Sequence, residues 1–181
     1  ERKKTEKKLI KSEELFRAAF ESSAVGLAIT SPDGFFIRVN KALSEIIGYS
    51  EYQIMSTTFL ELTHPDDYEL TSNMMSRTLK GEIPFYHIEK RYIHKDGHTI
   101  WVLVSVSLVR ESNGEPSFFV VQIQDVTAKK LAEEEMKKAK AEVEKIAFVD
   151  YLTGVMSRRA FNDRFNEEFQ RTGRSNSAIS L

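Results

Sequence analysis

The fold is decided by an alternating run between Thr99 and Val109, which reads TIWVLVSVSLV. Every second residue of the run is aliphatic, and successive side chains of a β-strand point to opposite faces of a sheet. We therefore predict a strand with one face in the core; that face carries Ile100, Val102, Val104, Val106 and Leu108. The other face mixes serines with Trp101 and Leu103, so we expect it to be half covered.

Turn signals on both sides join this run to two further strands. Asp96-Gly97 connects it to residues 87–94, and Asn113-Gly114 leads on into residues 117–124. Asp-Gly and Asn-Gly tolerate the positive φ angles of tight hairpins. The three strands are thus predicted to form an antiparallel meander.

The chain before the meander mixes short strands with helices. Two β-like runs, residues 26–30 and 35–39, are followed by a predicted helix over residues 41–47 that ends at Gly48. A second helix is predicted from Asp66 to Lys80, because proline and carboxylates at its start suit a first helical turn.

This order of elements resembles the PAS domain in its S-box form, over about residues 12–127. The motifs that carry the resemblance are Asp33-Gly34, Val39-Asn40, Ile47-Gly48-Tyr49-Ser50, His64-Pro65-Asp66-Asp67, Lys95-Asp96-Gly97, Trp101-Val102 and Asp125-Val126-Thr127. The resemblance implies an α+β fold, a five-stranded antiparallel sheet with helices on one face. Amphipathic helices are expected to flank it at both ends.

A second resemblance begins at residue 150, where the chain reads DYLTGVMSRRAF. It is similar to the opening motif of GGDEF domains, the fold of diguanylate cyclases. The matching residues are Asp150, Leu152, Thr153, Gly154, Arg158, Arg159 and Phe161, whereas Val155 and Ser157 depart from the motif. In the family the aspartate pairs with an arginine of the Arg-Arg element, a structural role. No Gly-Gly-Asp-Glu-Phe string follows, so we expect only the start of such a domain.

Four parts are therefore predicted along the chain: an N-terminal amphipathic helix (1–22), a PAS domain (23–127), a linker helix (128–149) and the truncated start of a GGDEF domain (150–181). The opening residues are charged and begin with Glu1, so the sequence is expected to be a piece of a longer protein.

The linker is predicted to pair with a second copy of the chain. Met136 and Val143 stand seven residues apart, and so do Ala132, Ala139 and Ile146, as in the a and d positions of a heptad repeat. The alanines in this seam make the pairing weak. We expect a homodimer formed through the terminal helices, with a solvated connector helix as the alternative.

Catalytic and metal-binding chemistry is not expected in this fragment. Cysteine is absent, and none of the four histidines (His64, His87, His94 and His98) pairs with a second ligand type at zinc spacing such as i,i+4 on a helix. The family's metal and guanine sites would lie beyond Leu181. We predict no catalytic residue, no metal site and no enzymatic activity for the fragment, while the parent is expected to be a diguanylate cyclase.

The PAS pocket is the remaining place for a ligand. Flavin-binding relatives use a cysteine, an asparagine and a glutamine; here the cysteine is missing, and Val102 and Ile123 stand at the matching strand positions. Haem-binding relatives use a histidine on the helix before the meander, and residues 66–80 contain none. Flavin and haem are therefore disfavoured, and no cofactor is predicted. The expected pocket is apolar, filled or open to an unidentified small ligand; its lining is predicted from Phe59, Met74, Met75, Val102, Val104, Val121 and Ile123.

The two resemblances imply a PAS sensory or dimerisation module of a bacterial-type signalling protein. It would control cyclic di-GMP synthesis from GTP, with Asp125, Val126 and Thr127 transmitting the signal into the linker helix. Two alternatives stay open: a PAS block that only dimerises, or an output that is a degenerate GGDEF or phosphodiesterase domain. Ser157 in place of the family asparagine favours the second alternative.

Charge and hydropathy argue against other partners. The net charge is −1 and no apolar run approaches the roughly 18 residues that cross a bilayer. We expect no nucleic-acid partner and no direct membrane contact by this fragment. The predicted location is the cytoplasm, with a membrane anchor further upstream in the parent left open.

Overall fold

The computed structural model describes residues 2–148, 161–162, 165–166 and 169. The chain divides after Ala128 into two units, and each is treated by itself. The first unit holds the sheet and its helices, and the second holds most of the last long helix.

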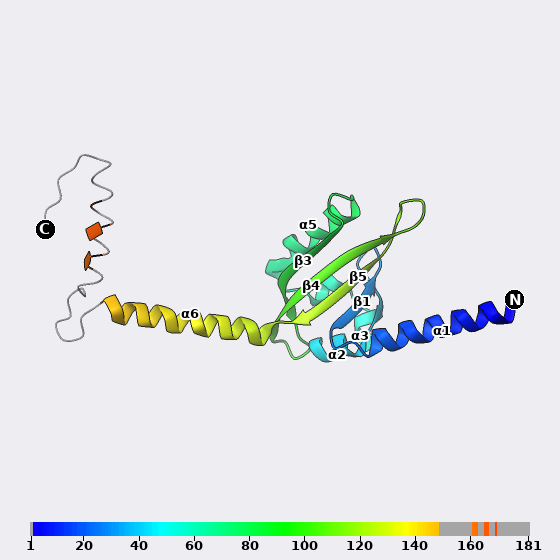
Figure 1. Cartoon of the computed structure of the whole chain (residues 1–181), viewed down its shortest axis with the longest axis horizontal. Helices are drawn as coiled ribbons and strands as arrows, with labels where there is room; N and C mark the ends of the chain where they lie inside the picture. Colours follow the sequence, from blue (N-terminus) through cyan, green and yellow to red (C-terminus); the bar gives the residue numbers. More distant parts are fainter. Residues whose placement is uncertain (1, 149–160, 163–164, 167–168, 170–181) are drawn as a thin grey trace. The chain divides into compact units, whose positions relative to one another are not determined.

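The first unit is built on one antiparallel sheet with the order β2-β1-β5-β4-β3 (Figure 1). Its strands are β1 (Gly26–Thr30), β2 (Phe36–Val39), β3 (Phe85–Ile93), β4 (Thr99–Arg110) and β5 (Pro116–Asp125). The predicted fold class, a five-stranded antiparallel sheet with helices, is confirmed. Because β3 to β5 follow one another through hairpins while β1 pairs with β5, the first two strands return to the far side of the meander.

The alternation in β4 produces the core. Val104 lies opposite Ile88 of β3 and Ile123 of β5. Ile100, Val102, Val104 and Val106 are buried, while Ser107 is exposed. Burying an aliphatic side chain of this size stabilises the fold by roughly 1.5–3 kcal/mol, so this one strand face anchors the sheet.

The helical segment between β2 and β3 supplies the cover for the inner face of the sheet. It comprises α2 (Lys41–Ile47), α3 (Glu51–Met55), α4 (Phe59–Leu62), a 3-10 turn η1 (Pro65–Asp67) and α5 (Tyr68–Leu79). Helix α2 packs on β1, α3 on β2, and α5 on β3 and β4.

Local sequence explains both ends of α2. The Asn40 side chain accepts a hydrogen bond from the backbone N–H of Leu43 at the start, and Gly48 ends the helix with φ of 78°. The start of α5 differs from the sequence prediction. Pro65, Asp66 and Asp67 form the 3-10 turn, and the α-helix begins only at Tyr68.

Helix α1 (Arg2–Glu21) meets the sheet at its C-terminal end. Phe20 is buried, and its carbonyl accepts a hydrogen bond of 3.0 Å from the buried Asn40 amide. The Arg38 guanidinium lies over the rings of Phe16 and Phe20, 5.2 and 5.0 Å from their centroids. The rest of α1 exposes apolar side chains: Leu9, Ile10 and Leu15.

The second unit contains most of α6 (Thr127–Phe148). Its Glu134 and Lys138 form an i,i+4 ion pair of 3.1 Å, while Leu131, Met136 and Val143 are exposed. Among the described residues, no helix combines the length and apolar character that crossing a membrane requires.

The predicted GGDEF opening motif, Asp150, Leu152, Thr153, Gly154, Arg158 and Arg159, lies outside the described residues. Just after it, the ring of Phe165 stacks on Phe161 and on Phe169, with centroid distances of 6.2 and 6.1 Å.

Candidate sensory pocket

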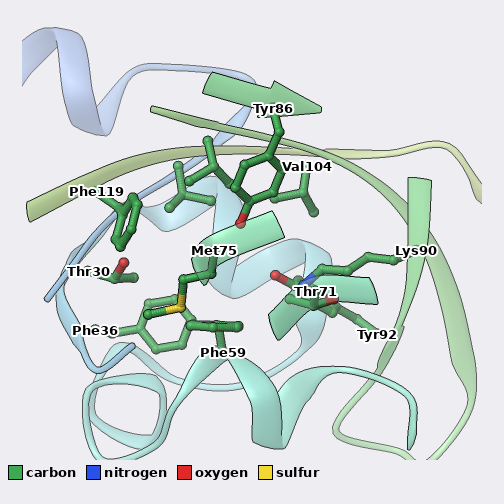
Figure 2. A pocket seen from close by; sticks show the side chains of 12 residues that line it. Thr30, Phe36, Phe59, Thr71, Met75, Tyr86, Lys90, Tyr92, Val104 and Phe119 are labelled. Atoms are coloured by element: carbon green, nitrogen blue, oxygen red, sulfur yellow. Dashed lines mark hydrogen bonds between the residues drawn. The ribbon is translucent and has the colours of Figure 1, made fainter. Parts of the chain in front are cut away.

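A cavity of about 20 Å³ lies between the inner face of the sheet and the helices α4 and α5 (Figure 2). This is about the room that one water molecule needs. Its lining is formed by Thr30, Phe36, Phe59, Thr71, Met75, Tyr86, Lys90, Tyr92, Val104, Val106, Phe119 and Val121.

Four of the seven residues that the sequence assigned to the pocket line this cavity: Phe59, Met75, Val104 and Val121. The other three do not. Val102 and Ile123 are buried in the core cluster, and Met74 is half-buried on α5, where its carbonyl accepts a hydrogen bond from Thr78.

The unexpected member of the pocket is Lys90 on β3, whose side chain is only 2% exposed. Its Nζ lies 3.2 Å from the Thr63 hydroxyl oxygen and 3.4 Å from that of Thr71. The same nitrogen lies 5.4 Å from the centroid of Phe59 and 4.9 Å from that of Tyr92. Such distances suit a cation over aromatic faces.

The hydroxyls of Thr63 and Thr71 can only accept hydrogen bonds from Lys90, because each donates its own hydrogen elsewhere. The Thr63 hydroxyl donates its hydrogen to the Phe59 carbonyl at 2.7 Å, and the Thr71 hydroxyl donates to the Asp67 carbonyl at 2.8 Å. A neutral amine has two N–H donors, which these two oxygens satisfy. An ammonium has three, so protonated Lys90 keeps one N–H without an acceptor among the described residues.

Burial dominates the electrostatics of the pocket. Loss of solvent lowers the pKa of Lys90 to about 7, and the charge of Asp67 opposes that shift only in part. Burial also raises the pKa of Tyr86 to about 12 and that of Tyr92 further still. Both tyrosines therefore stay neutral hydrogen-bond donors at any physiological pH.

Asp67 itself is held by Arg91, the neighbour of Lys90 in the chain. One carboxylate oxygen accepts from the Arg91 backbone N–H at 2.8 Å and from Nε at 3.0 Å, and the other accepts from a terminal nitrogen at 2.8 Å. These bonds lower the pKa of Asp67 below its ordinary value. The pair ties the turn before α5 to β3 and keeps this carboxylate engaged outside the pocket.

A second cluster of titratable groups occupies the β3–β4 hairpin. The ligand atoms of His94, Asp96 and His98 lie within 4.8 Å of one another, a set that could hold a metal ion. Our sequence analysis, which compared histidine spacing with helical zinc motifs, predicted no metal site. The histidine rings stack with centroids 4.3 Å apart, and His94 Nδ1 accepts the backbone N–H of Asp96 at 3.2 Å. These contacts order the turn.

The predicted transmission residues lie at the junction of β5 and α6. The backbone N–H of Thr127 donates to the Asp125 carboxylate at 2.8 Å, which caps the helix start. The Thr127 hydroxyl accepts from the Trp101 N–H at 2.9 Å, and the Val126 N–H donates to the Trp101 carbonyl at 2.9 Å. The beginning of α6 is thus bonded to strand β4.

A signal for Lys90 was present in the sequence. In β3 the residues with even numbers, Tyr86, Ile88, Lys90 and Tyr92, alternate with polar or exposed ones, so strand periodicity places Lys90 on the inner face. A lysine within an apolar strand face matches no catalytic or metal-binding motif, so the sequence prediction did not include it.

The geometry agrees with what comparison of the chain with known proteins finds. Residues 36–122 match a family model described as PAS fold. Together with the sheet order and the helices on its inner face, this match shows that the chain contains a PAS domain.

Solved structures share the fold. A PAS domain from Colwellia psychrerythraea superposes with a TM-score of 0.59 at 23% identity, covering 64% of this chain and 97% of that one. The N-terminal domain of a diguanylate cyclase with a PAS/PAC sensor from Marinobacter aquaeolei gives 0.52 at 17% identity, covering 59% and 98%.

Two curated relatives are longer signalling proteins. The probable diguanylate cyclase DgcE of Escherichia coli K12 is 38% identical over 128 residues, which are 71% of this chain and 12% of DgcE. The sensor histidine kinase TmoS of Ectopseudomonas mendocina is 30% identical over 139 residues, 77% of this chain and 14% of TmoS. The chain thus spans about one eighth of these relatives, as a PAS module of the kind found in sensor proteins.

Proposed function

We propose that the chain is the sensory and dimerising module of a diguanylate cyclase and regulates that enzyme through α6. The observation that carries the proposal is the β5–α6 junction. There the start of α6 is bonded to Trp101 of β4, the strand that also supplies Val104 and Val106 to the pocket. A change in the pocket that moves β4 would therefore act on the first turn of α6.

The cyclase output is supported by two similarities. The residues from Asp150 to Phe161 resemble the opening of a GGDEF domain, and DgcE is by name a probable diguanylate cyclase. The product would then be cyclic di-GMP, made from GTP by the part of the parent beyond Leu181. We place the module in the cytoplasm, where GTP is available.

A second candidate output is a histidine kinase, since the relative TmoS carries that name. The sequence of the parent after Leu181 decides between the two. A degenerate GGDEF domain or a phosphodiesterase domain would be recognised from the same part of the parent sequence. If the PAS domain only dimerises, substitutions in the pocket would not change the activity of the output domain.

The test is cyclic di-GMP synthesis by the purified parent protein with GTP and magnesium. Thr127→Val keeps the size of the side chain but removes the hydroxyl that joins α6 to Trp101. We expect it to change the cyclase rate severalfold while the PAS domain stays folded.

The matched control is Ser107→Ala, on an exposed position of the same strand. An unchanged rate in Thr127→Val would remove the junction from the mechanism. A parent that makes no cyclic di-GMP under any condition would overturn the cyclase output itself.

A further inference from the structure

Two hydrogen-bond donors among the residues that line the pocket, Lys90 and Tyr86, can take a further acceptor. The third N–H of protonated Lys90 has no acceptor among the described residues, as its two threonine partners show. The Tyr86 hydroxyl points into the cavity (Figure 2), and burial raises the pKa of this group, so it stays a donor. Both groups belong to the lining of one cavity, so an acceptor bound there can receive a hydrogen bond from each.

We propose that this cavity binds a small monocarboxylic acid, with the carboxylate held by the Lys90 ammonium and the Tyr86 hydroxyl and the hydrocarbon part against Met75, Phe59 and Phe119. The inference rests on the proposed function in taking this pocket as the sensory site. A carboxylate fits because it offers several acceptor positions and a negative charge to two donors, one of them cationic. An amide or an alcohol of the same size offers no charge.

The charges around Lys90 leave room for that anion. From the turn before α5, Asp67 is the carboxylate that acts on Lys90, and its oxygens are taken by Arg91. From β3, Tyr86 and Tyr92 are neutral, and the groups facing Nζ from the helical segment are the hydroxyls of Thr63 and Thr71. Asp67 is therefore the carboxylate among the described side chains that acts on the ammonium, its oxygens are engaged by Arg91, and the ligand would supply a second negative charge.

Proton balance follows from the free state. Around neutral pH part of the Lys90 population is neutral, and binding a carboxylate converts it to the ammonium by taking one proton from the buffer. Affinity for the anion should therefore fall by up to tenfold per pH unit above pH 7, since each unit lowers the protonated fraction of Lys90 by up to tenfold.

Size restricts the ligand further. The cavity has room for about one water molecule, so a side chain must move before a carboxylic acid can bind. Met75 is the side chain suited to this, because an unbranched thioether changes rotamer easily. An acid of two to four carbons needs the smallest displacement, and binding would push on α5, which carries Met75.

The test is titration calorimetry of the full chain with sodium acetate, propionate and butyrate at pH 6.5, with butyramide as the neutral match for butyrate. We expect at least one anion to bind, and butyramide to bind at least about tenfold more weakly than butyrate, as suits loss of a charge-assisted hydrogen bond. Lys90→Met and Tyr86→Phe should each weaken anion binding, the first by at least about tenfold. The controls Lys80→Met and Tyr52→Phe remove the same groups from exposed positions and should leave it unchanged.

A readout in the unmutated protein guards against variants that fail to fold. The ¹³Cε signal of Lys90 reports its protonation, and the bound anion should raise its pKa by at least about one unit. Equal affinity for butyrate and butyramide, an unshifted Lys90 titration, or no binding by any of the three acids would each overturn the proposal. None of these results touches the cyclase output, which the Thr127→Val experiment tests separately.

Discussion

Burial of Lys90 disfavours its charged form, and this makes the free energy of unfolding depend on pH. Its pKa is about 7 in the folded chain and near 10.5 in the unfolded chain. Between these values the unfolded chain binds more protons, so the free energy of unfolding rises with pH, by up to about 1.4 kcal/mol per unit. Below pH 7 both states are protonated and the full penalty of burial remains.

Replacing Lys90 with methionine should remove this dependence. We expect the free energy of unfolding to rise from pH 7 to pH 9 in the natural chain and much less in Lys90→Met, with Lys80→Met behaving as the natural chain. Urea unfolding at pH 7, 8 and 9 measures it, a range in which Tyr86 and Tyr92 stay protonated. Parallel slopes for all three proteins would show that Lys90 does not titrate in this range.

Asp67 acts in the opposite pH range. Its pKa is lowered by the bonds from Arg91, so its contribution is present above pH 4 and is lost as the pH falls through the folded value. Asp67→Asn should destabilise the chain by about 1.5–3 kcal/mol at pH 7, the usual worth of hydrogen bonds to a charged group. The difference should shrink at pH 3, which acid unfolding curves would reveal. Asp33→Asn, at an exposed turn, should cost little at either pH.

At the scale of elements, local chemistry predicted most of the fold. The hairpins at Gly97 and Gly114, the helix Lys41–Ile47 and the alternation in β4 follow from turn residues, caps and period, and all are confirmed. The start of α5 was wrong by two residues, because helix-start residues also suit a 3-10 turn. Strand periodicity places Lys90 on the inner face, but its bonds to Thr63 and Thr71 depend on how β3 packs against the helical segment, which the sequence alone does not give.

Asn40 joins three elements and offers a test at this scale. Its side-chain oxygen accepts from the N–H groups of Leu27 and Leu43, and its nitrogen donates to the carbonyls of Phe20 and Val25. Asn40→Ala leaves these buried groups unpaired, so we expect a loss of about 2–4 kcal/mol in unfolding free energy, since each orphaned group costs about 1–3 kcal/mol. Amide exchange at the end of α1 should also speed up. Asn73→Ala on exposed α5 is the control, and an equal effect of both variants would contradict the role of Asn40.

At the scale of the whole molecule, the exposed apolar side chains of α6 predict that the chain pairs with a second copy of itself. Leu131, Met136 and Val143 are each more than half exposed, and Met136 and Val143 follow the seven-residue spacing of a paired helix. Helices that leave such a stripe uncovered tend to pair, and the alanines between them should make the pairing modest in affinity. We expect the chain to be a parallel dimer at high micromolar concentration in light scattering.

The double variant Met136→Glu, Val143→Glu should shift the chain to a monomer, since like charges would face each other across the seam. The control Lys140→Gln, outside the seam, should leave the dimer intact. A chain that scatters light as a monomer at every concentration would contradict the dimer. A double variant that still dimerises would show that α6 does not form the interface, and α1, with its exposed Leu9 and Leu15, would be the surface to test next.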